Sequence, residues 1–219
     1  MIRTADSSDI PYMVKIHTTS LPDDLMPRIG LSYLNNQFYP IVLSSENAYT
    51  LVYENQEVQA FVIFTYNSKT FSKELTKNKF ALGCAILNQL PRDPLLIRDI
   101  LFASIGKRTI FRQSIKRYPD SFAELFLIAT HPSQQSKGIG RLIVREGLKH
   151  LKAKGIPICL VKTSSEKARS FYDHLGFFEI GIEYRGPRQL SILIHNSDKE
   201  KNLDIDEREK TQNTHPAGF

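Results

Sequence analysis

Hydrophobic positions at the start of the chain change from strand-like to helical spacing. Residues 1–4 predict a short strand. Ile10, Met13, Val14 and His17 then fall on one face of a helix, and the acidic and hydroxyl residues before them are candidate helix caps. The pattern therefore predicts a strand followed by an amphipathic helix.

The next segments predict a second helix and a hairpin. Residues 29–43 have helical spacing, with a predicted buried stripe of Leu31, Leu34, Phe38 and Ile41. Two runs rich in β-branched and aromatic residues, 49–53 and 58–64, flank a polar turn. Residues 68–118 are harder to place; 80–90 and 95–105 look helical, separated by prolines, and a basic run, Lys107–Arg117, follows.

From residue 122 onward the pattern becomes clearer. Residues 125–129 form a continuous apolar run, typical of a strand that is covered on both faces. Gly138-Ile139-Gly140 then leads into an amphipathic helix that Gly155 ends. Another buried strand, a short helix over 165–174 and two final strands follow, so the order from here is β-α-β-α-β-β. The predicted fold class is α/β in the α+β sense.

The chain has 219 residues, and its length and composition fit one globular domain, 1–196, followed by a polar tail over 197–219 that we expect to be mobile. The tail carries a net charge of −2 and the body +8. A basic body suits nucleic acid, anionic lipid or a phosphorylated ligand, but no nucleic-acid motif accompanies it. We find no secretory signal and no apolar run long enough to span a membrane, and two cysteines are too few for a disulfide framework. The predicted location is the cytoplasm.

The candidate binding loop is Gln135-Ser136-Lys137-Gly138-Ile139-Gly140, which lies between a buried strand and a helix. Small residues at a helix start let backbone N–H groups approach a phosphate, and Lys137 and Arg141 add positive charge. A Walker P-loop spacing is missing, and the third glycine of a dinucleotide fingerprint is replaced by Ile143. No spacing of His, Cys, Asp or Glu indicates a metal site.

Three motifs together resemble the GNAT superfamily of acetyl-CoA-dependent N-acetyltransferases. They are Phe122-Ala123-Glu124 leading into the apolar strand, Gln135-x-x-Gly138-x-Gly140, and Ala168-x-x-x-Tyr172-x-x-x-Gly176-Phe177, in the family's order and at its usual separations. The close match covers roughly residues 122–184. The resemblance implies a mixed, mostly antiparallel sheet with a splayed strand pair, flanked by helices. Residues 68–118 are longer than a minimal member requires.

The resemblance also implies the site. Backbone groups of Ile128, Ala129 and Thr130 should contact the pantetheine arm of acetyl-CoA, and the residues that should hold the pyrophosphate are Gln135, Ser136, Lys137, Gly138, Ile139, Gly140 and Arg141. Tyr172 matches the tyrosine that acts as general acid on the leaving sulfur, although it could simply pack among aromatic residues. Glu124 stands where some members place a base, or else is plain surface. Ser165 replaces the asparagine of many members, which puts that cofactor contact in doubt.

The predicted function is transfer of an acetyl group from acetyl-CoA to a primary amine of a small molecule. Leu21-Pro22, Ile29–Leu34 and Tyr39 are similar to a segment of bacterial family members associated with surface-polysaccharide synthesis, which implies an amino sugar linked to a nucleotide or lipid phosphate. Two alternatives stay open: a protein or peptide amine as acceptor, and a non-catalytic acyl-CoA-binding module. These features are compatible with a homodimer.

Overall fold

A computed structural model describes residues 1–105, 122–185 and 188–198. The basic run Lys107–Arg117 and nearly all of the predicted tail therefore lie outside the described residues. The strands are β1 (Ile2–Thr4), β2 (Ala48–Asn55), β3 (Glu57–Thr65), β4 (Ala123–Thr130), β5 (Ile158–Thr163), β6 (Phe178–Arg185) and β7 (Arg188–Asn196). The principal helices are α1 (Ile10–Ser20), α2 (Leu25–Ile29), α3 (Leu31–Tyr33), α4 (Tyr39–Ser44), α5 (Ser68–Leu75), α6 (Lys79–Gln89), α7 (Leu96–Ile105), α9 (Ile139–Ala153) and α10 (Glu166–Asp173).

The strands form one sheet in the order β1-β2-β3-β4-β5-β7-β6. Neighbouring strands are antiparallel except β4 and β5, which run parallel. A parallel pair needs a crossover between its strands, and α9 supplies it. The predicted mixed, mostly antiparallel sheet flanked by helices is confirmed.

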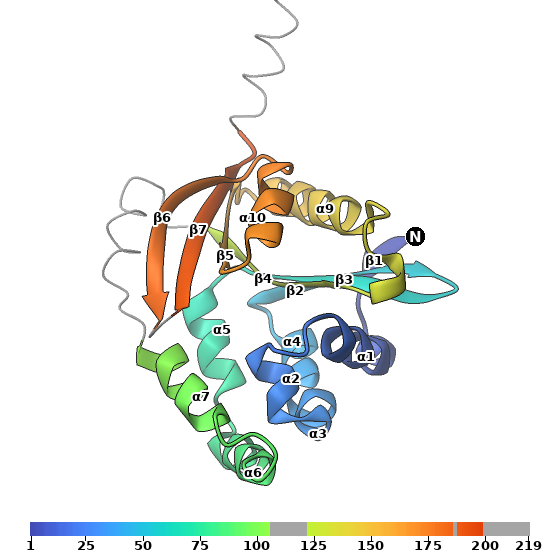
Figure 1. Ribbon diagram of the computed structural model, residues 1–219. Helices are drawn as coiled ribbons and strands as arrows, with labels where there is room; N and C mark the ends of the chain where they lie inside the picture. The colour runs from blue at the N-terminus through green and yellow to red at the C-terminus, as the bar shows by residue number, and fades with distance from the viewer. Residues whose placement is uncertain (106–121, 186–187, 199–219) are drawn as a thin grey trace, which may run out of the picture.

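Helices cover both faces of the sheet (Figure 1). The amphipathic helix α9 and the short helix α10 lie on one face, where Ile143, Val144 and Tyr172 share a core cluster with Leu125 and Val161 of the central strands. The helices α1–α7 lie on the other side, around a second cluster that joins α1–α4 to β3 (Figure 1). The paired residues of β4 and β5 thus lie in the sheet between the two core clusters.

The helix predicted over residues 29–43 is interrupted. Leu31 is 58% exposed, so the predicted stripe is wrong at that position. A π-helical turn, Leu34–Phe38, separates α3 from α4, which has a proline in its first turn. Because Pro40 has no N–H to continue the α-helical hydrogen bonds, the backbone widens there and shifts the buried face. Tyr33, Tyr39 and Val42 are buried as a result.

Between β3 and β4, in the segment predicted to be additional, the described residues form the helices α5, α6 and α7. The two that begin at Lys79 and Leu96 match the predicted helices over 80–90 and 95–105. Within the described residues, none of the helices has the length and apolar character needed to cross a membrane.

Candidate active site

Strands β4 and β5 separate soon after they meet. They pair only at Ala123 with Cys159 and at Glu124 with Leu160, although β4 continues to Thr130. On its other side, β4 stays paired with β3 along its length, but the register shifts so that Phe126 is an extra residue, a β-bulge. The pair is therefore splayed beyond Glu124, with the bulge beside the opening.

Backbone groups of β4 face the gap at alternate residues. The N–H of His131 donates to the carbonyl of Gln59 on β3 at 2.8 Å, so every second residue of β4, counted back from His131, bonds to β3 through its backbone. By this alternation Ala129 is directed at Phe61 of β3, whereas Ile128 and Thr130 present their N–H and C=O groups to the gap. Of the three predicted backbone contacts, Ile128 and Thr130 have the suitable direction.

The carbonyl of Thr130 already has two donors at the edge of the gap. The hydroxyl of Ser20, at the end of α1, donates to it at 2.8 Å, and the side-chain amide of Gln135 donates at 3.2 Å. The N–H of Thr130 is directed to the same side of the strand. Gln135, a predicted cofactor residue, thus fixes the start of the glycine loop against β4.

The glycine loop turns its backbone at two left-handed positions, Ser136 (φ 65°) and Gly138 (φ 81°). Gly138 is the N-terminal cap of α9, and no described side chain caps this helix. The N–H groups at the start of a helix have no partner within it, and the helix dipole makes this end partly positive. Ile139 has a buried side chain, which leaves its backbone as the part that can contact a ligand. The loop is suited to a diphosphate.

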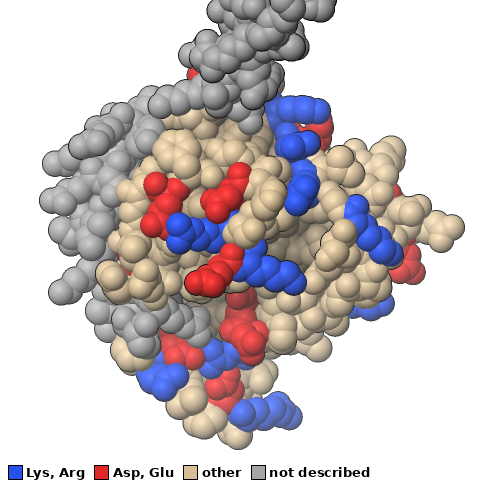
Figure 2. Space-filling model, turned by 45° about the horizontal axis from the view of Figure 1, so that its top comes forward, with Lys and Arg blue, Asp and Glu red and all other residues tan. Residues whose placement is uncertain are grey.

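Charge and space around the loop are consistent with that use. A Cβ atom added at Gly138 would meet nothing within 4 Å, so the approach is open. Arg141 is exposed, while the ammonium of Lys137 donates to Gln134 at 3.0 Å. Figure 2, which turns α9 and α10 toward the viewer, shows Lys and Arg side chains around a hollow in this face, with Asp and Glu beside them.

Tyr172 lies on α10, 5% exposed, in the core cluster between α9, α10 and the central strands. Its ring packs against Phe171 and Phe177, at centroid distances of 5.2 and 5.5 Å. Burial, and secondarily the thiol of Cys159, raises the pKa of the Tyr172 hydroxyl. The phenol therefore keeps its proton at neutral pH, which a general acid requires.

Glu124 lies at the last pair before β4 and β5 diverge. Its neighbours Ala123 and Leu125 pack on the α9 face, so alternation directs Glu124 to the opposite face. There its carboxylate is half-buried and accepts a hydrogen bond of 2.5 Å from Ser68 of α5. The two predicted catalytic side chains thus stand on opposite sides of the sheet.

Comparison with known proteins decides the family. Residues 16–177 match the model of the acetyltransferase (GNAT) family, about three quarters of the chain. The chain belongs to this family. The predicted family is confirmed.

Individual relatives are more distant. A mycothiol acetyltransferase from Thermomonospora curvata is 33% identical over 76 residues, which is 33% of this chain and 26% of that protein. The chain thus matches about a quarter of the length of this curated relative. Among solved structures, the ribosomal-protein-S18-alanine N-acetyltransferase from Escherichia coli is 16% identical, with a TM-score of 0.54 over 90% of this chain and 92% of that chain. The spermidine/spermine N-acetyltransferase from Vibrio cholerae is 15% identical, with a TM-score of 0.54 over 93% and 98%.

GNAT-type cofactor contacts from Ser165 have no support beyond the motif. Its hydroxyl caps α10, accepting from the N–H of Ala168 at 3.3 Å, and its own N–H bonds to Thr163. The predicted capping role is confirmed, and the cofactor contact stays a prediction.

Two site residues have no signature in the sequence. Ser20 and Ser68 contact the predicted cofactor strand and the predicted base from 110 and 56 residues away along the chain. Both begin or end a helix, where serine is a common capping residue, so neither would be singled out without the structure.

Proposed function

We propose that the protein is an N-acetyltransferase that moves an acetyl group from acetyl-CoA to a primary amine of a small molecule. The observation that carries this proposal is the splay of β4 from β5 beyond Glu124, beside a bulge and next to an uncapped helix start. The gap, the open approach at Gly138 and the free helix-start amides suit an extended ligand that ends in a diphosphate.

The residues divide the work between binding and proton transfer. Ile128 and Thr130 would bind the pantetheine arm through their backbone, and residues 135–141 would hold the pyrophosphate. When bound, acetyl-CoA supplies an acyl carbon already activated as a thioester. Glu124 takes a proton from the attacking amine, directly or through a water, and Ser68 holds the carboxylate in place. Tyr172 gives its proton to the departing sulfur.

The opposite placement of Glu124 and Tyr172 supports this division. An amine adds to the acyl carbon from above or below the plane of the thioester, so the attacking nitrogen and the leaving sulfur occupy different positions on the tetrahedral carbon and can be served by two separate proton-transfer groups. The base stands on the side of α1–α7 and the acid on the side of α9 and α10. The acceptor therefore approaches through the α1–α7 side.

A small amine is the preferred acceptor class. The curated relatives matched in sequence are named mycothiol acetyltransferases, after a small molecule. A nucleotide- or lipid-linked amino sugar is the specific candidate that the segment around Ile29–Leu34 suggests. The solved structures of similar fold include enzymes named for a protein alanine and for spermidine, so the fold by itself selects neither class.

Thiol release from acetyl-CoA, measured with spermidine, glucosamine, a nucleotide-linked amino sugar and a lysine-containing peptide, tests the proposal. A calorimetric titration with CoA accompanies it. We expect CoA to bind and at least one small amine to accelerate thiol release. CoA binding without acceleration by any amine would instead favour the non-catalytic acyl-CoA-binding module.

A further inference from the structure

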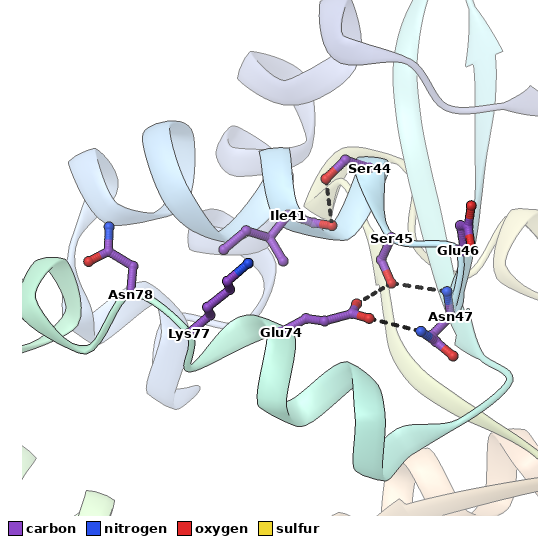
Figure 3. A pocket seen from close by; sticks show the side chains of 8 residues that line it. All are labelled: Ile41, Ser44, Ser45, Glu46, Asn47, Glu74, Lys77 and Asn78. Carbon is purple, nitrogen blue, oxygen red and sulfur yellow. Dashed lines mark hydrogen bonds between the residues drawn. The ribbon is translucent and has the colours of Figure 1, made fainter.

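The inserted helices α5–α7 are fastened to the α2–α4 segment at two separate places. At the first, the Glu74 carboxylate of α5 accepts hydrogen bonds from the hydroxyl of Ser45 and the amide of Asn47, in the connection from α4 to β2 (Figure 3). An open cavity of about 740 Å³ lies beside these contacts, and none of the predicted site residues lines it. This end attaches α5 firmly to the body of the domain.

At the second place, Arg28 of α2 bonds to Asp93 in the α6–α7 connection and to Asp99 in α7. Its guanidinium donates two bonds to the carboxylate of Asp93, at 2.7 and 3.1 Å, and a third to Asp99 of α7 at 2.7 Å. The Arg28 side chain is only 18% exposed. Fork-shaped, charge-assisted bonds of this kind fix direction as well as distance. Arg28 thus supplies the ionic contacts between α2 and α7, beside the apolar packing of the buried Leu96 at the start of α7.

The segment that carries Arg28 is also anchored at the gap. It begins at Ser20, whose hydroxyl donates to the Thr130 carbonyl at the edge of the splay. It ends at Gly30, where an added Cβ would lie 2.6 Å from the side chain of Gln89 on α6. Residues 20–30 therefore form a continuous connection from the cofactor strand to the inserted helices.

Helix α7 contacts β6 as well as α2. The splay divides the sheet into two arms, one that ends at β4 and one that begins at β5. Helix α2 packs against the first arm, whereas β6 lies in the second arm, beyond β5. Figure 1 shows α7 below the end of β6, on the same side of the sheet as α5, whose Ser68 bonds to Glu124. Helix α7 therefore bridges the two arms on the side of the sheet that carries Glu124 (Figure 1).

We propose that Arg28 is a positioning residue that holds α7 across the acceptor side and thereby limits the acceptor to small amines. This inference rests on the proposed function and adds a size limit with a specific cause. A lysine side chain on a folded protein needs space for the chain on either side of it, whereas a free amine passes beside α7. Loosening α7 should weaken the binding of a small acceptor and reduce the discrimination against peptides.

The test compares Arg28→Met with Arg98→Met. Arg98 also bonds to Asp99, but it lies on α7 itself, is 55% exposed and, within the part of the chain that the structure describes, bonds to no second element. Steady-state kinetics are measured with the small amine from the panel above that wild type acetylates best, and with the lysine-containing peptide. Calorimetric CoA affinity and circular dichroism establish that each variant is folded.

Arg28→Met loses all three charge-assisted bonds, and for this variant we expect the KM of the small amine to rise about tenfold, with CoA affinity unchanged. The preference for the small amine over the peptide should fall by a similar factor. Arg28→Lys, which keeps the charge without the fork, should restore part of the loss, and Arg98→Met should behave as wild type.

Three results would overturn the inference. They are an unchanged KM and preference in a folded Arg28→Met, an equal effect of Arg98→Met, and efficient acetylation of the peptide by wild type. In each of these the acetyltransferase proposal still stands. If none of the amines tested accelerates thiol release by the wild-type protein, the proposed function fails, and the size limit fails with it. Amide hydrogen exchange in residues 96–105 gives an independent readout, and it should be faster in Arg28→Met alone.

Discussion

Two glycines at opposite ends of α9 allow a controlled test of the predicted pyrophosphate loop. Gly138 has φ 81° and Gly155 has φ 76°, and at both positions an added Cβ would meet nothing within 4 Å. A non-glycine residue in this left-handed region costs about 1–2 kcal/mol. Replacing either glycine by glutamate should therefore reduce the free energy of unfolding by the same amount, without a steric clash.

CoA binding should separate the two variants. A carboxylate at Gly138 would repel a diphosphate held by the amides of residues 138–141. For two like charges about 5 Å apart in an effective dielectric constant of about 20, the repulsion is about 3 kcal/mol, which corresponds to a dissociation constant raised about 100-fold. Gly155→Glu places the same charge at the far end of the fifteen-residue helix and should leave the affinity unchanged.

Calorimetric titration with CoA measures the affinity, and urea denaturation measures the shared loss of stability. Gly138→Gln completes the set, because it keeps the size and the backbone strain but removes the charge, and it should recover most of the lost affinity. The reasoning is refuted if Gly138→Glu binds CoA as wild type does, or if Gly155→Glu weakens binding equally. In either case the diphosphate would have to bind elsewhere.

Three further predictions concern packing, catalysis and pH. In Gly147→Ala the new methyl would lie 2.0 Å from the Phe64 ring, so an overpacking cost of about 1–3 kcal/mol should exceed the gain in helix propensity. Gly83→Ala has open space around the new methyl, and urea denaturation should show its free energy of unfolding raised by about 1 kcal/mol. Tyr172→Phe keeps the ring contacts, so kcat should fall at least about tenfold while CoA affinity and melting temperature stay close to wild type. Burial lowers the pKa of His150 in the folded protein, so the unfolded chain binds the imidazole proton more tightly. The free energy of unfolding should therefore be highest above the ordinary histidine pKa of 6.5 and decrease as the pH falls below it. Urea denaturation at a series of pH values measures this dependence, which His150→Gln should weaken.

The local structure of the predicted cofactor loop could be predicted because its signals are local. Gly138 and Gly140 mark a backbone turn directly, and the apolar runs on either side identify the strand and the helix that position it. The N-cap at Ser165 and the left-handed Gly155 are likewise single-residue signals, and both appear as expected. The direction of each β4 backbone group could not be predicted from the sequence, because it depends on the pairing register and on the bulge at Phe126.

The helix predicted over 29–43 shows where periodicity fails. Its spacing assumes one uninterrupted phase, but Gly30, with φ 117°, breaks the chain before α3, and the π-turn inserts a wider step before α4. Each break rotates the following residues about the axis, so Leu34 and Phe38 stay buried while Leu31 turns outward. Propensity cannot reveal such a shift, because the packing of the turn against α1 and the sheet decides it.

The acceptor half differs from the cofactor half in its physical construction. A thioester ligand needs mainly backbone amides and a gap, which a few glycines and one bulge provide wherever the fold occurs. An acceptor is selected by side chains from separate segments, and here the contacts that shape its side join residues far apart in the chain: Ser68 with Glu124, and Arg28 with Asp93 and Asp99. Such pairs leave no spacing pattern, because their members lie 56 to 71 residues apart in the chain. We therefore expect side chains of the inserted helices α5–α7, and not the glycine loop, to determine which acceptor this protein uses.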